Sequence, residues 1–234
     1  MKFCFICATQ KPVGSQLPIM RFLADFNEQA HPELDIRLHV IWNNHDGLSK
    51  AYNKATSDYL DSNYICYCHD DWTCNDFEFF KKVKESKFDL IGTVGGLQYC
   101  VPYDWETRPF LWTEACQGKA SGFVQHVHPQ YPDLMLPNGF GPSPLPCVWL
   151  DGQCLIFTRK AIESGLTFDE DFTFDHYDGS VCFRARQMDL KVGTAPILAT
   201  HASCGQGMMA HKDRYMESQR RFIQKYFRKV QKSA

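Results

Sequence analysis

Residues 64–71, with the sequence YICYCHDD, place five apolar or aromatic residues directly before a histidine and two aspartates. An apolar run of this length without alternation is typical of a strand that is buried on both faces, as in a parallel sheet. Polar groups at the carboxyl end of such a strand lie in the crevice where open α/β sheets bind ligands. Adjacent carboxylates there favour a positive partner, and a divalent cation that holds a diphosphate is one candidate. On this stretch alone, a helix cap followed by an exposed acid in a turn fits equally well.

The first part of the chain alternates between short apolar runs and segments with helical spacing. Strands are predicted at residues 2–8, 36–42 and 64–68, and helices at residues 19–29 and 48–60. The links between them are short, and this alternation is typical of a doubly wound, mostly parallel sheet. The expected fold class is therefore α/β, with helices flanking the sheet.

Further elements follow with less regular spacing. A short helix is predicted at residues 77–87, and a strand that runs into a glycine-rich turn at residues 89–96. These glycines do not follow the order Gly-x-Gly-x-x-Gly, so a dinucleotide site is not indicated. The remaining predicted elements are a strand at 148–157 that Asp151 and Gly152 interrupt, a helix at 159–165, a helix at 180–188 and a strand at 191–199.

Residues 97–147 are rich in aromatic residues, prolines and glycines, and they show little periodicity. A long irregular stretch in a compact domain is often a binding loop or lid, although a loosely structured insertion has the same composition. His126 and His128 alternate on a possible strand and would face one side together. Such pairs are more often incidental than metal ligands.

The composition limits the classes of partner. Lys and Arg number 25 against 27 Asp and Glu, so the net charge gives no support for a nucleic-acid partner. No apolar run approaches the roughly 20 residues that span a bilayer. The start of the chain, MKFCFICATQ, looks like a first strand and lacks the cleavage site of a signal peptide, so a cytoplasmic location is expected. The 11 cysteines lie mostly in apolar runs and are interpreted as reduced core residues, with neither disulfides nor structural zinc.

The last part of the chain, residues 211–232, is predicted to form a basic helix with eight Lys and Arg residues against Asp213 and Glu217. One interpretation is a terminal helix that docks on the body of the protein with a solvated outer face. The other is a surface for phosphate or anionic lipid, which would place the protein at the periphery of a membrane.

Acids and a histidine lie at element boundaries where chemistry is expected. Asp71, Asp151 and Asp178 lie at or near strand or helix boundaries, and His201 follows the last strand. Around one edge of a sheet, these four side chains can converge in a single crevice. Carboxylate and imidazole together suit Mn²⁺ or Mg²⁺ as a cofactor, which would offset charge on a leaving diphosphate. A separate carboxylate could deprotonate an incoming hydroxyl group.

The order of these motifs resembles the family-2-type glycosyltransferases of GT-A fold, and among them a small bacterial glycosyltransferase-like branch whose metal motif has the form His-x-Asp. The matching segments are Gly47–Ala55, His69-Asp70-Asp71, Asp151-Gly152, Phe168–Asp178 and His201. They span roughly residues 1–205. The resemblance implies a single GT-A-like domain over 1–234, with a nucleotide-binding half at 1–96, an acceptor and sugar half at 97–205 and the basic helix at 206–234.

The resemblance also implies roles for individual residues. Asp71 and His201 would bind the metal, and Asp178 would be the general base of an inverting reaction. Asp70 would lie near the ribose or the sugar. The other residues implied in nucleotide or sugar binding are Thr9, Asn43, Asn44 and Asp46 beside the nucleobase, Asn53 within the first matched segment, and Asp151 and Gly152 beside the sugar and acceptor.

Two departures from the family pattern bear on catalysis. His69 replaces the first acid of the usual metal motif, which leaves one carboxylate fewer, and Ser180 stands where many relatives carry another acid. The leading hypothesis is a metal-dependent, inverting glycosyltransferase with a UDP-sugar donor and an unknown sugar, lipid or protein acceptor. The alternative is a nucleotide-sugar-binding protein with little or no turnover. A metal-dependent phosphohydrolase is a third hypothesis, which the dispersed carboxylates disfavour.

Overall fold

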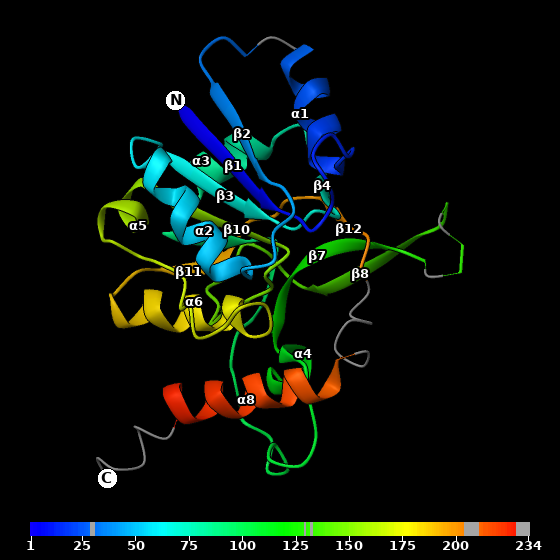
Figure 1. The fold of residues 1–234 in the computed structure, drawn as a ribbon, viewed down its shortest axis with the longest axis vertical. Helices are drawn as coiled ribbons and strands as arrows, with labels where there is room; N and C mark the ends of the chain where they lie inside the picture. Colours follow the sequence, from blue (N-terminus) through cyan, green and yellow to red (C-terminus); the bar gives the residue numbers. More distant parts are fainter. Residues whose placement is uncertain (29–30, 129, 132, 204–210, 228–234) are drawn as a thin grey trace.

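The structure is a computed structural model that describes residues 1–28, 31–128, 130–131, 133–203 and 211–227 (Figure 1). Its larger sheet has six strands in the order β11-β5-β10-β3-β1-β2. The strands are β1 (Lys2–Ala8), β2 (Asp35–Ile41), β3 (Tyr64–Cys68), β5 (Leu90–Gly92), β10 (Cys154–Thr158) and β11 (Val192–Thr194). Only β10 runs antiparallel to its neighbours, which confirms the mostly parallel α/β sheet.

Helices cover both faces of this sheet. Alternate residues of its strands point to opposite sides, and because both sets are apolar, both faces must be buried. Phe5 and Cys66 belong to one apolar cluster, which α1 (Pro18–Glu28) and α3 (Phe79–Glu85) cover. Ile6 and Tyr67 belong to the other cluster, on the opposite face. The elements that cover this second face are α2 (Leu48–Thr56), which the turn η1 (Ser57–Tyr59) continues, α5 (Arg159–Glu163) and α6 (Tyr177–Gln187). The predicted elements of the first half are therefore confirmed, and β3 lies within the sheet between β10 and β1.

A second sheet, of order β4-β12-β7-β6-β9 with β8 paired to β7, adjoins the first. Its strands are β4 (Trp72–Cys74), β6 (Val94–Gly96), β7 (Ala120–Val127), β8 (Met135–Gly141), β9 (Trp149–Leu150) and β12 (Ala199–His201). The expectation that residues 97–147 have little regular structure is therefore wrong for β7 and β8, which form a long hairpin that projects from the body in Figure 1. β8 is not predicted from the sequence, because it contains Pro137 and two glycines, residues that are uncommon in strands. An edge strand tolerates them.

Several predicted strands are divided because the chain passes from one sheet to the other. The strand expected at 148–157 is β9 in the second sheet and β10 in the first, and Asp151 and Gly152 link them. The stretch 89–96 is divided in the same way into β5 and β6. A side chain at Gly95 would place its Cβ 2.4 Å from the carbonyl oxygen of Trp149, so this glycine permits close packing of strands.

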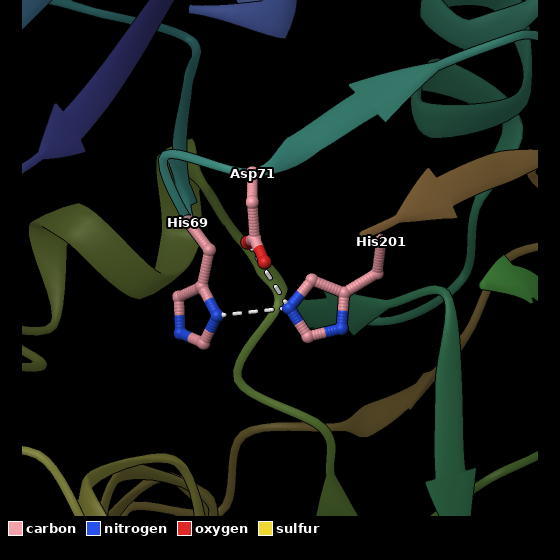
Figure 2. Close-up of side chains that lie close together, drawn as sticks. All are labelled: His69, Asp71 and His201. Atoms are coloured by element: carbon pink, nitrogen blue, oxygen red, sulfur yellow. Dashed lines mark hydrogen bonds and ion pairs between the residues drawn. The ribbon is translucent and has the colours of Figure 1, made fainter. Parts of the chain in front are cut away.

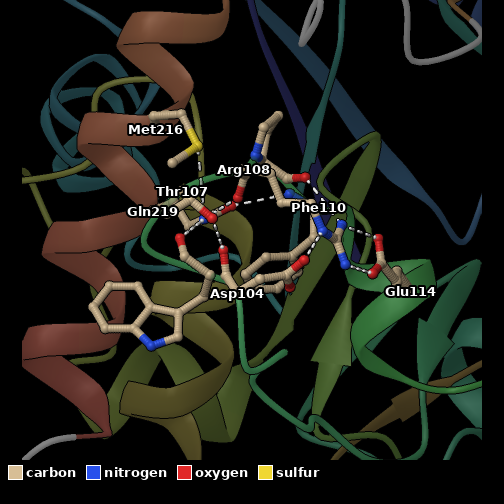
Figure 3. A network of polar contacts seen from close by, with 9 residues as sticks. Asp104, Thr107, Arg108, Phe110, Glu114, Met216 and Gln219 are labelled. Atoms are coloured by element: carbon tan, nitrogen blue, oxygen red, sulfur yellow. Dashed lines mark hydrogen bonds and ion pairs between the residues drawn. The ribbon is translucent and has the colours of Figure 1, made fainter.

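The terminal helix α8 (Lys212–Tyr226) docks on the segment that precedes α4 (Trp112–Ala115). Figure 3 shows Gln219, which is fully buried, reaching from α8 into this segment. Its Nε2 donates hydrogen bonds to the carbonyl oxygens of Trp105 (2.6 Å) and Arg108 (2.9 Å), and its Oε1 accepts one from the amide of Phe110 (3.1 Å). Because these partners are backbone groups, Gln219 fixes the path of the chain between them.

The basic side chains of α8 mostly bind groups of the protein itself. Arg214 binds Asp175 (2.8 Å), and Lys225 binds Asp169 (2.6 Å). Arg221 donates to the carbonyl oxygen of Asp171 at 2.9 Å. The docked helix is thus confirmed, while contact with an anionic membrane stays a prediction. Three of the basic residues counted in the tail, at 228, 229 and 232, lie outside the described residues.

The interpretation of the cysteines agrees with the described part of the chain. Ten cysteines lie there, all are free thiols, and all but Cys100 are buried. Burial raises the pKa of the Cys4 thiol to about 12, which keeps this thiol protonated and unreactive. Among the described helices, none has the length and apolar character that crossing a membrane requires.

Candidate functional site

Three side chains meet at the carboxyl end of β3 (Figure 2). His69 and Asp71 lie in the link between β3 and β4, and His201 is the last residue of β12. Antiparallel pairing of β12 with β4 sets His201 opposite Trp72, the neighbour of Asp71. The Nε2 of His201 lies 3.2 Å from Oδ1 of Asp71 and 3.3 Å from Nδ1 of His69. The structure therefore brings together Asp71 and His201, as the sequence predicts, and adds His69.

The charges of this group suit a cation-binding site. Burial opposes ionisation of Asp71, but the hydrogen bond from His201, the charges of His201 and His69 and the hydrogen bond from the amide of Ser203 together lower the pKa of the carboxyl group to about 2. Burial and the nearby charge of His201 lower the pKa of His69 to about 4. Burial would lower the pKa of His201, yet the hydrogen bond and charge of Asp71 raise it. At neutral pH, Asp71 is a carboxylate and His69 a neutral imidazole, which are the forms that bind metal ions.

The donor atoms fit a divalent metal ion. One atom from each of His69, Asp71 and His201 lies within 4.8 Å of the other two, and within the described residues this is the only such group of histidine, cysteine and acidic side chains. Two imidazole nitrogens and one carboxylate oxygen form a donor set that first-row transition metals accept. In the sequence, His69 matches the first residue of a His-x-Asp metal motif and means one carboxylate fewer, but it was not among the predicted metal ligands. In the structure, the imidazole of His69 lies where it could supply a ligand in place of that carboxylate.

This group lines one of two adjoining clefts. The larger has a volume of about 540 Å³ and is lined by Thr9, Asn44, Asp46 and Asp70, all predicted to bind nucleotide or sugar. The smaller, of about 300 Å³, is lined by the three residues of the metal group. The residues that the clefts share are Ala8, Leu48, Asp70 and Phe174. A ligand in the larger cleft would therefore lie beside the metal group.

Asp70 and Thr9 are hydrogen-bonded to each other in the lining of the larger cleft. Thr9 Oγ1 donates a hydrogen bond of 2.5 Å to Asp70 Oδ2, and Lys11 Nζ lies 3.5 Å from the same oxygen. The amide of Asn44 donates to the carbonyl oxygen of Thr9 at 2.8 Å, which joins the ends of β1 and β2. Asn43 has a φ of 52°, a left-handed conformation that asparagine tolerates, and it does not line the cleft.

Asn53 lies away from both clefts. Its Nδ2 donates to the carbonyl oxygen of Phe168 at 3.0 Å, and its Oδ1 accepts from the amide of Phe168 at 2.8 Å. These bonds tie α2 to the loop before α6. The predicted nucleotide contact of Asn53 stays a prediction, and the structure gives this side chain a clear role in the fold.

Asp178 lies at the start of α6 (Tyr177–Gln187), apart from the metal group. The helix begins at Tyr177 rather than at the predicted residue 180, so Asp178 lies in its first turn. Its carboxylate accepts hydrogen bonds from the amides of Gly179 (2.7 Å) and Gly152 (3.1 Å). Burial and the negative charge of Asp151 nevertheless raise the pKa of Asp178 to about 7. Asp178 does not line either cleft, although a pKa near neutrality suits a general base.

Asp151 lines neither cleft but lies close enough to both His69 and Asp178 to influence them electrostatically. Its Oδ2 accepts a hydrogen bond of 3.0 Å from Nε1 of Trp112, and its charge influences the pKa values of both His69 and Asp178. The neighbouring carbonyl oxygen of Gly152 accepts a hydrogen bond from the hydroxyl group of Tyr177 at 2.5 Å.

Two residues near the candidate site were not predicted to belong to it. Arg214 of α8 lines the larger cleft, where its guanidinium lies over the ring of Phe174, 5.5 Å from the centroid. His126 pairs with His201 across β7 and β12, and the two ring centroids are 5.9 Å apart. The basic tail and the alternation of histidines at 126 and 128 were the signals in the sequence. Neither identified the partner, because the partners come from distant segments.

No protein-family model matches the sequence, and no curated protein is similar to it at a significant level. The fold, however, is similar to solved glycosyltransferase structures. The mannosyltransferase PcManGT from Pyrobaculum calidifontis, in complex with GDP-Man and Mn²⁺, aligns over 89% of this chain and 59% of its own, with 14% identity and a TM-score of 0.50. GalNAc-T7 with UDP, GalNAc and Mn²⁺ aligns over 86% of this chain and 44% of its own, with 8% identity and a TM-score of 0.53.

A third similar structure is A197 from STIV, which aligns over 87% of this chain and 86% of its own, with 10% identity and a TM-score of 0.49. The chain spans about three-fifths of PcManGT and less than half of GalNAc-T7. At these identities, the similarity to the two transferases shows a shared fold, and the expected GT-A-like α/β class is confirmed.

Proposed function

We propose that the protein is a metal-dependent glycosyltransferase that uses a nucleotide-diphosphate sugar, with a UDP-sugar as the expected donor. The observation that carries this proposal is the position of His69, Asp71 and His201 in one cleft, which shares Asp70 with the adjoining cleft that Thr9 lines. The two similar transferases, which hold a nucleotide or nucleotide sugar with Mn²⁺, support it. A bound divalent ion would supply Lewis-acid stabilisation of the negative charge on a leaving diphosphate.

The residues of the chain would divide the remaining work. Thr9, Asn44 and Asp46 would seat the nucleoside, and Asp70 would orient the ribose or the sugar. In an inverting transfer, the acceptor oxygen bonds to the anomeric carbon as the bond from that carbon to the diphosphate breaks. Asp178 would take the proton of the acceptor hydroxyl group, for which its raised pKa is suited.

One set of observations favours the second candidate function, a nucleotide-sugar-binding protein with little or no turnover. Asp178 does not line either cleft, and Ser180 is fully buried with its hydroxyl group donating to the carbonyl oxygen of Tyr177. Ser180 therefore supplies no substitute for the acid that many relatives carry. Sustained release of UDP together with a sugar-bearing product would exclude this function.

Thermal unfolding with UDP tests the proposal. UDP at about 100 times its dissociation constant should stabilise the protein by about 2.7 kcal/mol, but only when Mn²⁺ is present. For a chain of this length, that corresponds to a rise of roughly 5–10 °C in Tm. Mn²⁺ alone and UDP with a chelator are the controls. The same rise with the chelator, or no rise in any condition, would contradict a metal-dependent nucleotide site.

A further inference from the structure

The side chain of Tyr177 contacts the candidate metal group through His69. It is buried, with 3% of its surface exposed, and its hydroxyl oxygen lies 2.9 Å from Nε2 of His69. The same oxygen lies 2.5 Å from the carbonyl oxygen of Gly152. Two oxygens that are this close need a proton between them, and the carbonyl oxygen has none to give. The Tyr177 hydroxyl group therefore donates to Gly152.

This direction fixes the tautomer of His69. The hydroxyl group has a single proton, and because that proton is used on Gly152, the oxygen can only accept from the His69 ring. The ring proton of neutral His69 must then lie on Nε2, which leaves the lone pair of Nδ1 free. Nδ1 faces Nε2 of His201 at 3.3 Å, on the side where the donor atoms of the group meet.

Gly152 leaves the space that this arrangement needs. A side chain at this position would place its Cβ 2.5 Å from the Tyr177 hydroxyl oxygen, so the hydroxyl group can approach only because residue 152 is glycine. The backbone amide of Gly152 in turn donates to Asp178 at 3.1 Å. The resemblance to glycosyltransferases implies a place for Gly152 beside the sugar, and in the structure Gly152 also accepts the hydrogen bond of Tyr177.

We propose that Tyr177, held by the carbonyl oxygen of Gly152, is a positioning residue that fixes His69 as an Nδ1 ligand of the metal centre. Histidine ligands usually donate their second ring N–H to a carboxylate, a backbone carbonyl group or water, and loss of this partner typically weakens metal binding 10–100-fold. Here the hydroxyl oxygen of Tyr177 is the acceptor. The centre then offers two imidazoles and one carboxylate. It selects ions that accept imidazole nitrogen, such as Mn²⁺ and Co²⁺, over Mg²⁺, which prefers oxygen ligands. This inference rests on the metal centre of the proposed function and deepens it.

Calorimetric titration of the full chain with Mn²⁺, Co²⁺ and Mg²⁺, without nucleotide, tests this role. The wild-type protein should bind Mn²⁺ and Co²⁺ at least about tenfold more tightly than Mg²⁺. Tyr177→Phe should bind Mn²⁺ and Co²⁺ about 10–100-fold more weakly and change the visible absorption of bound Co²⁺. Tyr67→Phe is the matched control, because it removes the buried hydroxyl group of another tyrosine, which is hydrogen-bonded to Thr56. It should leave the affinities for Mn²⁺ and Co²⁺ unchanged.

A second variant keeps the test decisive if Tyr177→Phe does not fold. His69→Asp replaces the imidazole with a carboxylate and should move the preference toward Mg²⁺. Wild-type affinity for Mg²⁺ equal to that for Mn²⁺, or unchanged Mn²⁺ affinity in folded Tyr177→Phe, would overturn the inference.

If metal binding follows the expected pattern but UDP does not bind, the inference stands and the proposed function fails. If UDP binding requires Mn²⁺ but Tyr177→Phe behaves like the wild type, only the inference fails. If no ion binds to the wild-type protein, both are overturned.

Discussion

Asp71→Ala is expected to abolish Mn²⁺-dependent binding of UDP. Asp71 supplies the only carboxylate of the candidate metal group, and its charge also holds His201 through a contact of 3.2 Å. Without it, two imidazoles would remain, and the pKa of His201 would lose the interaction that raises it. We expect the affinity for UDP in the presence of Mn²⁺ to fall by at least about 100-fold, as loss of an entire ligand exceeds the typical 10–100-fold effect of an outer-shell partner. Calorimetry with UDP and Mn²⁺ measures this change.

The fold should tolerate this substitution, because the side chain of Asp71 is 28% exposed and lies in a link between strands. The matched control is Asp25→Ala, which removes an exposed carboxylate from α1 that pairs only at 4.0 Å with Arg21. This control should bind UDP like the wild type. An Asp71→Ala protein that is folded and binds UDP with unchanged affinity in Mn²⁺ would remove Asp71 from the metal site.

Asp178→Ala should separate catalysis from binding. Loss of a general base typically lowers the rate by about 10²–10⁴-fold, so sugar transfer should fall in that range. UDP binding in Mn²⁺ should change little, since Asp178 lines neither cleft. In the wild type, burial and Asp151 raise the pKa of Asp178 to about 7. The transfer rate should therefore rise as the pH increases through this value and then level off. Steady-state rates and calorimetry on the same preparations measure both effects.

The shifted pKa of Asp178 also has a consequence for stability. Because the carboxyl group of the folded protein binds its proton more tightly than that of the unfolded chain, its contribution favours folding at acidic pH. That contribution is lost as the pH rises from the ordinary aspartate range toward about 7. Asp178 would therefore be maintained at a cost in stability above neutral pH, as expected for a base rather than for a structural acid.

Equal loss of UDP binding in Asp71→Ala and Asp178→Ala would refute the division of roles in which Asp71 binds the metal and Asp178 acts as the base.

Local sequence predicted the first half of the fold well. β1 and β3 coincide with their predicted ranges, and α2 begins at the predicted residue, because each is specified by its own apolar pattern. The hairpin of β7 and β8 was missed, since its glycines and Pro137 break local patterns while pairing between strands supplies the order. Where the chain passes from one sheet to the other, as between β9 and β10, the two strands form a single apolar run in the sequence. Only the tertiary structure shows where such a run changes sheets.

The candidate site was predicted in part for the same reason. Asp71 and His201 were each predicted at the end of a strand, and the antiparallel pairing of β12 with β4 in the second sheet brings them together. The role proposed here for His69 could not be predicted from its neighbours in the sequence, because it depends on contacts with Tyr177 and Gly152, which lie far along the chain. Arg214 reaches the larger cleft only because α8 packs beside it.

Crystals soaked with Mn²⁺ and UDP test the central claim most directly, because the anomalous scattering of manganese locates the ion. The expected result is one strong peak within coordination distance of Nδ1 of His69, a carboxylate oxygen of Asp71 and Nε2 of His201, with the diphosphate of UDP completing the shell. The nucleoside should lie in the cleft lined by Thr9 and Asp70. A manganese peak elsewhere, or UDP bound with no ion at these three side chains, would contradict the account.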